Sequence, residues 1–212
     1  MKRILLDGPI PVNCYLIEEG QSCYVVDPGF EKEKLARFVK DLGLEVKGIL
    51  LTHGHFDHMT ALDAFDVPIY LHEEERVILQ DTYKNGLAYY DLERPYDLKN
   101  LKLISLKGGD CLDLGGHPIE VIHTPGHTVG CVCYKYKNEL YTGDTLFRGT
   151  VGRWDFPSGD LATLQASLVD LIDSQDPETM VYPAHYDSST IGHEKNTNDF
   201  YLQWKRILDE DT

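Results

Sequence analysis

The chain has 212 residues, with 35 acidic and 20 basic side chains, a formal net charge of −15 and an apolar fraction of 42%. This length allows a substantial core and is typical of one domain, so we expect a single domain over residues 1–212. The negative charge argues against nucleic acid as a partner, because polyanions bind to basic surfaces. No apolar run approaches the roughly 18 residues of a membrane span, so we expect no membrane partner either.

The start of the chain and its cysteines favour the cytoplasm. The apolar run that follows Lys2 and Arg3 ends at Leu6, well short of the ~7–15 residues of a signal-peptide core. The five cysteines are an odd number, which fits reduced thiols better than a framework of disulfides. We therefore expect a cytoplasmic protein.

Strands and helices alternate along the first part of the chain. Apolar segments bounded by turn residues predict strands, and apolar residues at helical spacing predict helices. Residues 81–100 place tyrosines among Lys, Asn, Gly and Pro, which predicts a loop or lid insertion. The elements expected before this insertion are strands at 3–6, 13–18, 22–26, 46–51 and 68–71 and helices at 31–42, 57–65 and 73–80.

The second part of the chain repeats this alternation. A helix is expected over 160–172 with Asp160 as its N-cap, and an amphipathic helix through Phe200 and Trp204 is expected at the carboxyl end. Strands alternating with helices and turn-rich meanders imply an α/β architecture. The strands expected here lie at 119–123, 131–136, 140–142 and 180–182.

Four side chains that can bind metal stand within six residues, directly after the predicted strand 46–51. Imidazole and carboxylate are natural ligands for zinc, and a glycine between two histidines lets the chain turn tightly. If the first two histidines face one ion, the following aspartate and histidine can face a second ion roughly 3.5–4 Å away. The segment reads His53-Gly54-His55-Phe56-Asp57-His58.

Three later strands each end in a tight turn and one further ligand, namely His127, Asp144 and His185. Taken alone, each would more often be an ordinary polar residue. Their shared position at strand ends, together with the histidine cluster, makes the joint signal strong. The two oxygens of Asp144 suit it to bridge the ions, which leaves His127 and His185 to complete one site each.

The successive motifs H-x-H-x-D-H, P-G-H-T, G-D-T-L-F and P-x-H, spread over residues 50–185, resemble those of the metallo-β-lactamase superfamily. The resemblance is closest to its glyoxalase II-like (hydroxyacylglutathione hydrolase-like) branch. It implies a four-layer αββα sandwich with two metal ions at one edge, between the sheets. The ligands it implies are His53, His55 and His127 for the first ion, Asp57, His58 and His185 for the second, and Asp144 between them.

The chemistry expected from such a site is hydrolysis of a small acyl thioester or a similar anionic substrate. Two zinc ions, with iron or manganese as alternatives, lower the pKa of a shared water, so that a metal-bound hydroxide attacks the carbonyl. Asp57 is expected to orient this hydroxide as well as to bind metal. A thiolate leaves with little acid assistance.

The resemblance also implies a substrate contact. Arg153 stands where glyoxalase II places a basic residue that binds the carboxylate of glutathione, although pairing with Asp155 is an equal alternative. The segment His185-Tyr186-Asp187 replaces the His-Glu-Tyr of that branch. The residues after it suffice for one helix, so we expect no counterpart of the helical domain that completes the glutathione site in glyoxalase II.

Three other functions remain open from the sequence. Persulfide dioxygenases share this framework but hold one iron, with ligands at the positions of His53, His127 and Asp144. A lactonase would use the same hydroxide to open a ring, and a non-catalytic metal-binding protein is the third alternative. A complete second set of ligands favours two ions and therefore a hydrolase. Of the other histidines, His123 is expected to make a structural hydrogen bond.

Overall fold

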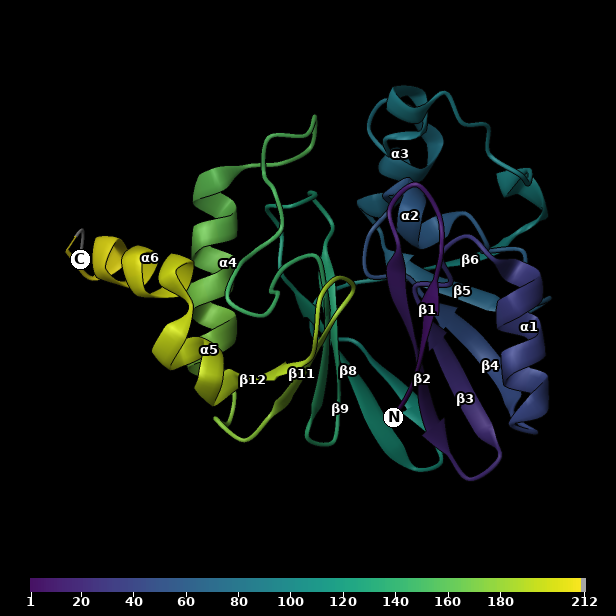
Figure 1. Cartoon of the computed structure of the whole chain (residues 1–212), viewed down its shortest axis with the longest axis horizontal. Coiled ribbons are helices and arrows are strands. Elements are labelled where there is room, and N and C mark those ends of the chain that lie inside the picture. The colour runs from purple at the N-terminus through teal and green to yellow at the C-terminus, as the bar shows by residue number, and fades with distance from the viewer. Residues whose placement is uncertain (211–212) are drawn as a thin grey trace.

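Two six-stranded sheets pack face to face in the computed structural model, which describes residues 1–210 (Figure 1). The strands of the first sheet are β1 (Lys2–Leu6), β2 (Val12–Glu19), β3 (Ser22–Val26), β4 (Glu45–Leu50), β5 (Pro68–His72) and β6 (Lys102–Leu106). They lie side by side in chain order. The β1–β2 and β2–β3 pairs are antiparallel, and the pairs from β3 to β6 are parallel.

The second sheet is built from the later part of the chain. Its strands are β7 (Cys111–Leu114), β8 (His117–His123), β9 (Val132–Tyr136), β10 (Glu139–Gly143), β11 (Met180–Pro183) and β12 (Ser189–Thr190). They too follow chain order across the sheet. Among them only the β10–β11 pair is parallel, and α4 lies in the connection between these two strands.

Helices cover both outer faces, so the layers run helix, sheet, sheet, helix (Figure 1). On one side lies α1 (Lys32–Asp41), and on the other lie α4 (Leu161–Ser174), α5 (Ile191–Thr197) and α6 (Asp199–Glu210). Two short helices, α2 (Phe56–Met59) and α3 (Glu75–Gln80), lie near the ends of the first sheet's strands. Within residues 1–210, no helix is both long and apolar enough to cross a membrane.

Alternation of side chains along the strands builds three separate cores. On β2, Leu16 packs in the cluster beneath α1, whereas Tyr15 and Ile17 point between the sheets. On β9, Tyr134 points between the sheets and Cys133 packs in the cluster beneath α4 to α6. A period of two puts successive residues on opposite faces, so both sheets are buried on both sides. The expected αββα sandwich is confirmed.

The first helix of the site is shorter than the helix expected over 57–65. It stops after Met59 because the loop that follows β3 takes the next backbone hydrogen bonds. The carbonyl of His58 accepts from the Gly29 N–H at 3.1 Å, and the Ala61 N–H donates to the Gly29 carbonyl at 2.6 Å. The helix is therefore a single turn that fixes side chains of the site.

Several strands and helices were not predicted from the pattern of hydrophobic residues. β6 and β7 are sheet-edge strands with mostly exposed or half-exposed residues, so their sequences lack a clear apolar face. β12 and α5 lie after His185, where one helix was expected and two are present. The helix expected at 160–172 is confirmed as α4, and the Asp160 side chain accepts from the Thr163 N–H at 2.8 Å.

Residues 81–100 contain two 3-10 turns, Leu87–Tyr90 and Leu98–Asn100. The segment is held to the body by buried contacts. Asn85 is fully buried and donates to the Leu79 carbonyl, and the Tyr96 hydroxyl donates to the Met59 carbonyl at 2.6 Å. The organisation as one domain with a lid stays a prediction.

Candidate metal centre

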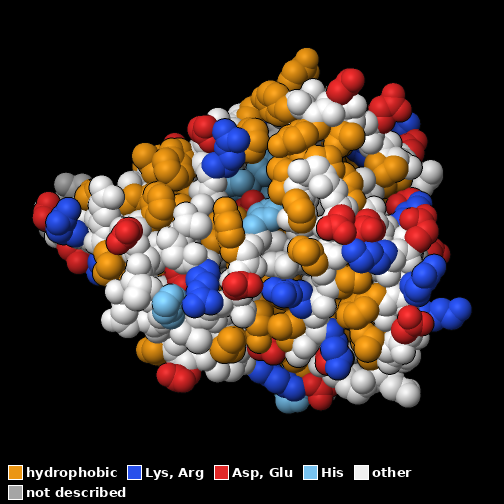
Figure 2. Space-filling model, in the orientation of Figure 1, with side chains coloured by type: hydrophobic (Ala, Val, Ile, Leu, Met, Phe, Trp, Pro, Cys, Tyr) orange, Lys and Arg blue, Asp and Glu red, His pale blue; other side chains and the backbone are white. Residues whose placement is uncertain are grey.

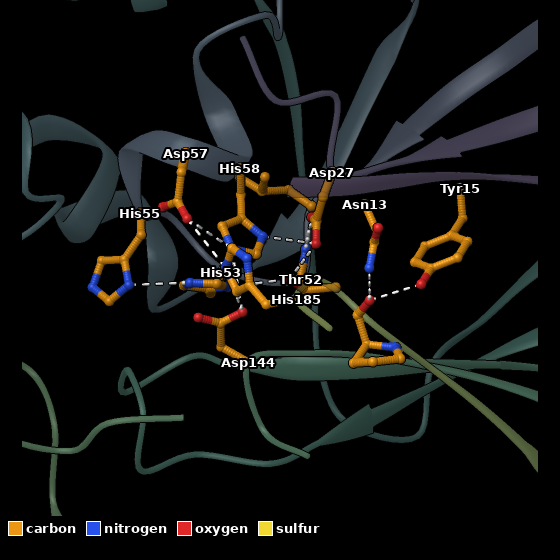
Figure 3. Close-up of polar contacts among 12 residues, drawn as sticks. Asn13, Tyr15, Asp27, Thr52, His53, His55, Asp57, His58, Asp144 and His185 are labelled. Atoms are coloured by element: carbon orange, nitrogen blue, oxygen red, sulfur yellow. Dashed lines mark hydrogen bonds and ion pairs between the residues drawn. The ribbon is translucent and has the colours of Figure 1, made fainter. Parts of the chain in front are cut away.

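The structure brings the seven predicted ligands together at the ends of strands from both sheets. Figure 3 labels six of the seven, all except His127. The first four come from the first sheet, at the end of β4 and in α2, and the other three follow strands of the second sheet. They form adjoining groups of histidine and carboxylate side chains, most of them buried. The residues are His53, His55, Asp57, His58, His127, Asp144 and His185.

The first group is a triangle of three imidazole nitrogens. Nε2 of His53 lies 3.1 Å from Nδ1 of His55 and 3.2 Å from Nε2 of His127, and the third side measures 2.9 Å. Imidazoles that share a tetrahedral ion, with bonds of about 2.0–2.1 Å, have nitrogens about 3.3 Å apart. The observed triangle fits one shared ion.

The second group consists of two histidines and two aspartates that face one another. Nε2 of His58 lies 3.6 Å from Oδ2 of Asp57 and 3.3 Å from Oδ1 of Asp144. Nε2 of His185 lies 3.3 Å from the same Asp57 oxygen and 3.5 Å from the same Asp144 oxygen. The other oxygen of Asp144, Oδ2, lies 3.4 Å from Nε2 of His127 in the first group. Asp144 therefore presents one oxygen to each group.

Two buried polar atoms of the second group lack hydrogen bonds to the rest of the chain. Nε2 of His58 and Oδ1 of Asp144 are inaccessible to solvent, and apart from their mutual contact at 3.3 Å they make no hydrogen bond within the described chain. A buried polar atom without a partner costs about 1–3 kcal/mol, and more when it is charged. A cation between these atoms would satisfy both, so the donor set fits a bound metal.

Hydrogen bonds to the opposite ring nitrogens orient three of the histidines. Nδ1 of His127 donates to the Arg153 carbonyl at 2.6 Å, and Nδ1 of His185 donates to the Pro11 carbonyl at 2.9 Å. His53 bonds through Nδ1 to the Thr52 hydroxyl at 3.1 Å. A proton on Nδ1 leaves the lone pair on Nε2, the nitrogen that faces the groups.

Asp27 orients the fourth histidine and was missed by sequence reasoning. Its carboxylate accepts from Nδ1 of His58 at 2.9 Å, from the Thr52 N–H at 2.8 Å and from the Thr52 hydroxyl at 2.7 Å. Its backbone is left-handed, with φ at 51°. Such a conformation is uncommon outside glycine and is frequent at functional sites.

Glu75 is a second residue that sequence reasoning missed. It is fully buried in α3 and accepts hydrogen bonds from the Gly54 N–H at 2.6 Å, the Thr128 hydroxyl at 2.5 Å and the Gly130 N–H at 2.8 Å. These partners flank His55 and His127, so one carboxylate fastens the two loops that form the triangle. Burial raises the pKa of Glu75 to about 7, against the opposing effect of these hydrogen bonds.

The environment keeps the triangle neutral. Burial, followed by the charge of His127, lowers the pKa of His55 to about 3. Burial and the charge of His58 lower the pKa of His53 well below its usual range, and burial lowers the pKa of His127 as well. Neutral imidazoles with free lone pairs are the form that binds a metal ion.

The second group, in contrast, favours positively charged histidines. Burial disfavours a charged His58 ring, but the carboxylates of Asp57, Asp27 and Asp144 outweigh it and raise the pKa of His58. Burial likewise opposes charge on His185, and Asp144 and Asp57 raise its pKa. The buried carboxylates thus demand positive charge, which protons supply in the metal-free chain and which a metal ion would supply instead.

Arg153 lies in the wall of the site but its guanidinium is already paired. Nε and Nη2 donate to the two carboxylate oxygens of Asp155 at 2.6 and 2.8 Å, and the guanidinium carbon lies 4.0 Å from the centre of the Phe156 ring. Its role in substrate binding stays a prediction. Outside the site, His123 bonds through Nε2 to the Val129 carbonyl at 3.1 Å, which confirms the expected structural hydrogen bond.

A cavity of about 580 Å³ opens over the two groups. Figure 2 shows histidine side chains at the bottom of a hollow near the centre of the view, with hydrophobic side chains around it. The floor is formed by His55, Asp57, His127, Asp144 and His185. The ligand groups can therefore be reached by a small molecule from solvent.

Comparison with known proteins agrees with this geometry. A family model described as the metallo-beta-lactamase superfamily matches residues 7–185. The chain therefore belongs to the metallo-beta-lactamase superfamily, whose members are generally metal-dependent hydrolases.

Three relatives align over nearly their whole length. A protein of Aquifex aeolicus is 37% identical over 206 residues, which cover 93% of this chain and 95% of the relative. The probable metallo-hydrolase YqgX of Bacillus subtilis is 33% identical, with coverage of 91% and 93%. The hydroxyacylglutathione hydrolase GloC of Haemophilus influenzae is 34% identical, with coverage of 89% and 92%.

Two solved structures are similar in both sequence and fold. The BLEG-1 B3 metallo-beta-lactamase has a TM-score of 0.86 and 35% identity, with coverage of 94% of this chain and 98% of that chain. TTHA1623 in a di-iron-bound form has a TM-score of 0.81 and 37% identity, with coverage of 94% and 100%.

Proposed function

We propose that this protein is a dinuclear-metal hydrolase of small acyl thioesters. The observation that carries the proposal is the placement of Asp144, with Oδ2 facing the histidine triangle and Oδ1 facing the second group. A closed structural site needs only four ligands, whereas two adjoining groups joined by one carboxylate suit a pair of ions that act together. The similarity to GloC, which is named a hydroxyacylglutathione hydrolase, supports the thioester class.

The ligands would divide as the two groups divide. His53, His55 and His127 would hold the first ion, and Asp57, His58 and His185 the second, with Asp144 between them. When bound, such a pair of ions lowers the pKa of a water toward neutrality and polarises a carbonyl group.

The chain's own residues supply orientation. Asp57 Oδ2 lies between the rings of His58 and His185, at 3.6 and 3.3 Å, at the floor of the cavity. A carboxylate there can accept a hydrogen bond from an attacking water and hold it toward the substrate carbonyl. A departing thiolate is a weak base, so the reaction needs no strong acid from the protein.

Zinc is the metal we propose, with iron or manganese as alternatives. Imidazole nitrogens and carboxylate oxygens suit all three ions. The related TTHA1623 is known in a di-iron-bound form. Elemental analysis of the purified protein distinguishes the three metals.

Two rival reactions differ in what they require. A persulfide dioxygenase would use one iron and oxygen, and it would leave the Asp57, His58 and His185 group without a function. A lactonase would use the same two ions on a cyclic ester. The similarity to the BLEG-1 B3 metallo-beta-lactamase also makes a β-lactam a necessary comparison substrate.

The proposed setting is the cytoplasm. All five cysteines lie at described positions and all are free, four of them buried, as expected where thiols stay reduced. Fractionation of the source cells would test this.

The decisive experiment measures metal and activity in one sample. Protein purified without added metal is analysed for zinc, iron and manganese, then assayed on S-lactoylglutathione, an uncharged acetyl thioester, a lactone and a β-lactam, and for oxygen uptake with glutathione persulfide. Near two ions per chain with thioester turnover, lost in Asp57→Ala, supports the proposal. One iron per chain with oxygen uptake and no hydrolysis would replace it with the dioxygenase.

A further inference from the structure

The cavity over the metal centre is largely apolar beyond its floor. Its wall includes Phe56, Phe147 and Phe156, and three large side chains at its mouth are unusually open to solvent. These are Leu5, Tyr90 and Tyr186, with exposed fractions of 50%, 43% and 66%. Exposed apolar groups that border a cleft commonly mark the contact with a ligand.

The backbone of Tyr186 is strained and is held by packing and by a hydrogen bond. Its φ is 68°, a left-handed conformation that is rare for a bulky residue, and its ring packs against Phe147 with centroids 5.4 Å apart. Its carbonyl accepts from the Asn13 side chain at 2.9 Å, which fixes the backbone. A strained residue that presents an exposed aromatic ring to a cavity indicates a contact for substrate.

The polar groups of the wall are already committed to other partners. Asn13 donates to the Pro183 and Tyr186 carbonyls, and the amide of Asn85 is bonded to Leu79 and Leu87. Their hydrogen-bonding groups are used for structure.

Charge is equally scarce. Among the described residues that line the cavity, Arg153 is the only lysine or arginine, and its bidentate pair with Asp155 has no net charge. Glutathione carries two carboxylates, and a site that selected it would offer unpaired cations to them. Here Asp155 already accepts both hydrogen bonds of the guanidinium, and the formal net charge of the chain is −15.

We infer that the preferred substrate is an uncharged thioester with an apolar or aromatic body, recognised by Tyr90, Phe147, Phe156 and Tyr186. This inference rests on the proposed thioesterase function and departs from the anionic substrate expected from the sequence. The Arg153–Asp155 pair weakens the attraction of anionic carriers, because Asp155 already occupies the guanidinium.

A matched pair of substrates tests the inference. The metal-loaded protein is assayed on S-acetylglutathione and on the acetyl ester of 2-phenylethanethiol, which have the same acyl group and the same bond to break. Burial of the phenyl group predicts a kcat/KM at least about tenfold higher for the uncharged thioester. Equal values, or a preference for the glutathione thioester, would overturn the inference.

Two variants test the roles of Tyr186 and Asp155 in substrate preference. Tyr186→Ala is expected to lower the ratio of kcat/KM on the phenylethyl thioester to kcat/KM on the glutathione thioester about tenfold, and Tyr186→Phe is expected to keep the wild-type ratio. Asp155→Asn frees Arg153 and is expected to shift the ratio of the two kcat/KM values several-fold toward glutathione. Ratios that neither variant moves would contradict the assignment.

Binding of inert analogues separates this inference from the proposed function. Thioether ketones, with a methylene between sulfur and carbonyl, cannot be hydrolysed as thioesters, and calorimetry gives their Kd. Tighter binding of the phenylethyl analogue than of the glutathione analogue supports the inference even if neither thioester is hydrolysed, a result that would sink only the proposed function. Tighter binding of the glutathione analogue would overturn the inference.

Discussion

The carboxylate of Asp27 accepts a hydrogen bond of 2.9 Å from Nδ1 of His58, the ring whose other nitrogen is buried and faces the carboxylates of the second group. The two residues come from different strand ends, after β3 and after β4. This bond fixes the ring's proton on Nδ1 and thereby leaves the lone pair of Nε2 for a metal ion.

Asp27→Asn is expected to weaken one ion only. The side-chain amide introduced by this change could donate to His58, which would favour the proton on the wrong ring nitrogen. We expect metal affinity at the second position to fall about 10–100-fold, with the first ion retained. Competition titration with a chelator measures this, and Asp66→Asn, at an exposed surface position, is the matched control. Equal loss of both ions would argue against a specific role.

Removal of single ligands should separate the two positions. His185→Ala takes one nitrogen from the second group alone, so about one ion per chain should remain after dialysis. Asp144→Ala takes an oxygen from each group and is expected to weaken the binding of both ions. Elemental analysis of the two variants decides the point. Two tightly bound ions in Asp144→Ala would show that this residue does not bridge.

Glu75 should make stability depend on pH. Burial raises its pKa from 4.5 to about 7, so the folded chain binds this proton more tightly than the unfolded chain does. Stability from this group is therefore full below about pH 4.5 and is lost as pH rises toward 7, by about 3 kcal/mol.

The matched variant is Glu75→Gln, which cannot titrate. The free energy of unfolding of the metal-free wild type minus that of the variant should fall between pH 4.5 and 7 and then level off. Urea unfolding at a series of pH values gives this difference. A difference that is flat across the window would mean that the carboxylate is ionised throughout.

Gly126 permits the close contact that places His127. Its φ is 129°, and an added Cβ would lie 2.3 Å from the backbone nitrogen of Leu164 in α4. Gly126→Ala is expected to cost about 3 kcal/mol or more and to lower metal content, because helix and loop must separate. Gly20→Ala, with φ at 59° and no atom within 4 Å, is the control and should cost about 1 kcal/mol. Urea midpoints compare the two, and similar losses would refute the packing argument.

The sequence predicts the seven residues of the candidate site but not the residues that hold them in position. The seven residues of the candidate site could be predicted because four of them are neighbours in the chain and the rest follow predicted strands. Asp27 and Glu75 gave no such signal, since they contact residues 21 to 55 positions away and are common residue types. The pairing of Arg153 was undecidable from sequence, because an arginine two residues from an aspartate can face either way.

Whether a strand could be predicted from the sequence depends on how much of it is buried. Strands buried on both sides, such as β2, have long apolar runs that a pattern reveals. Edge strands such as β6 and β7 have little buried surface, so only their partners in the sheet define them. The four-layer arrangement was implied by the resemblance to the superfamily, because the hydrophobic pattern by itself does not show which faces of the two sheets pack together.

The division of ligands between the two sheets has a consequence for biosynthesis. A nascent chain presents His53, His55, Asp57 and His58 early, but neither group is complete until residues far downstream have been translated. The last of them, His185, comes from the end of β11. On the proposed assignment, stable binding of either ion would therefore require both sheets to have formed.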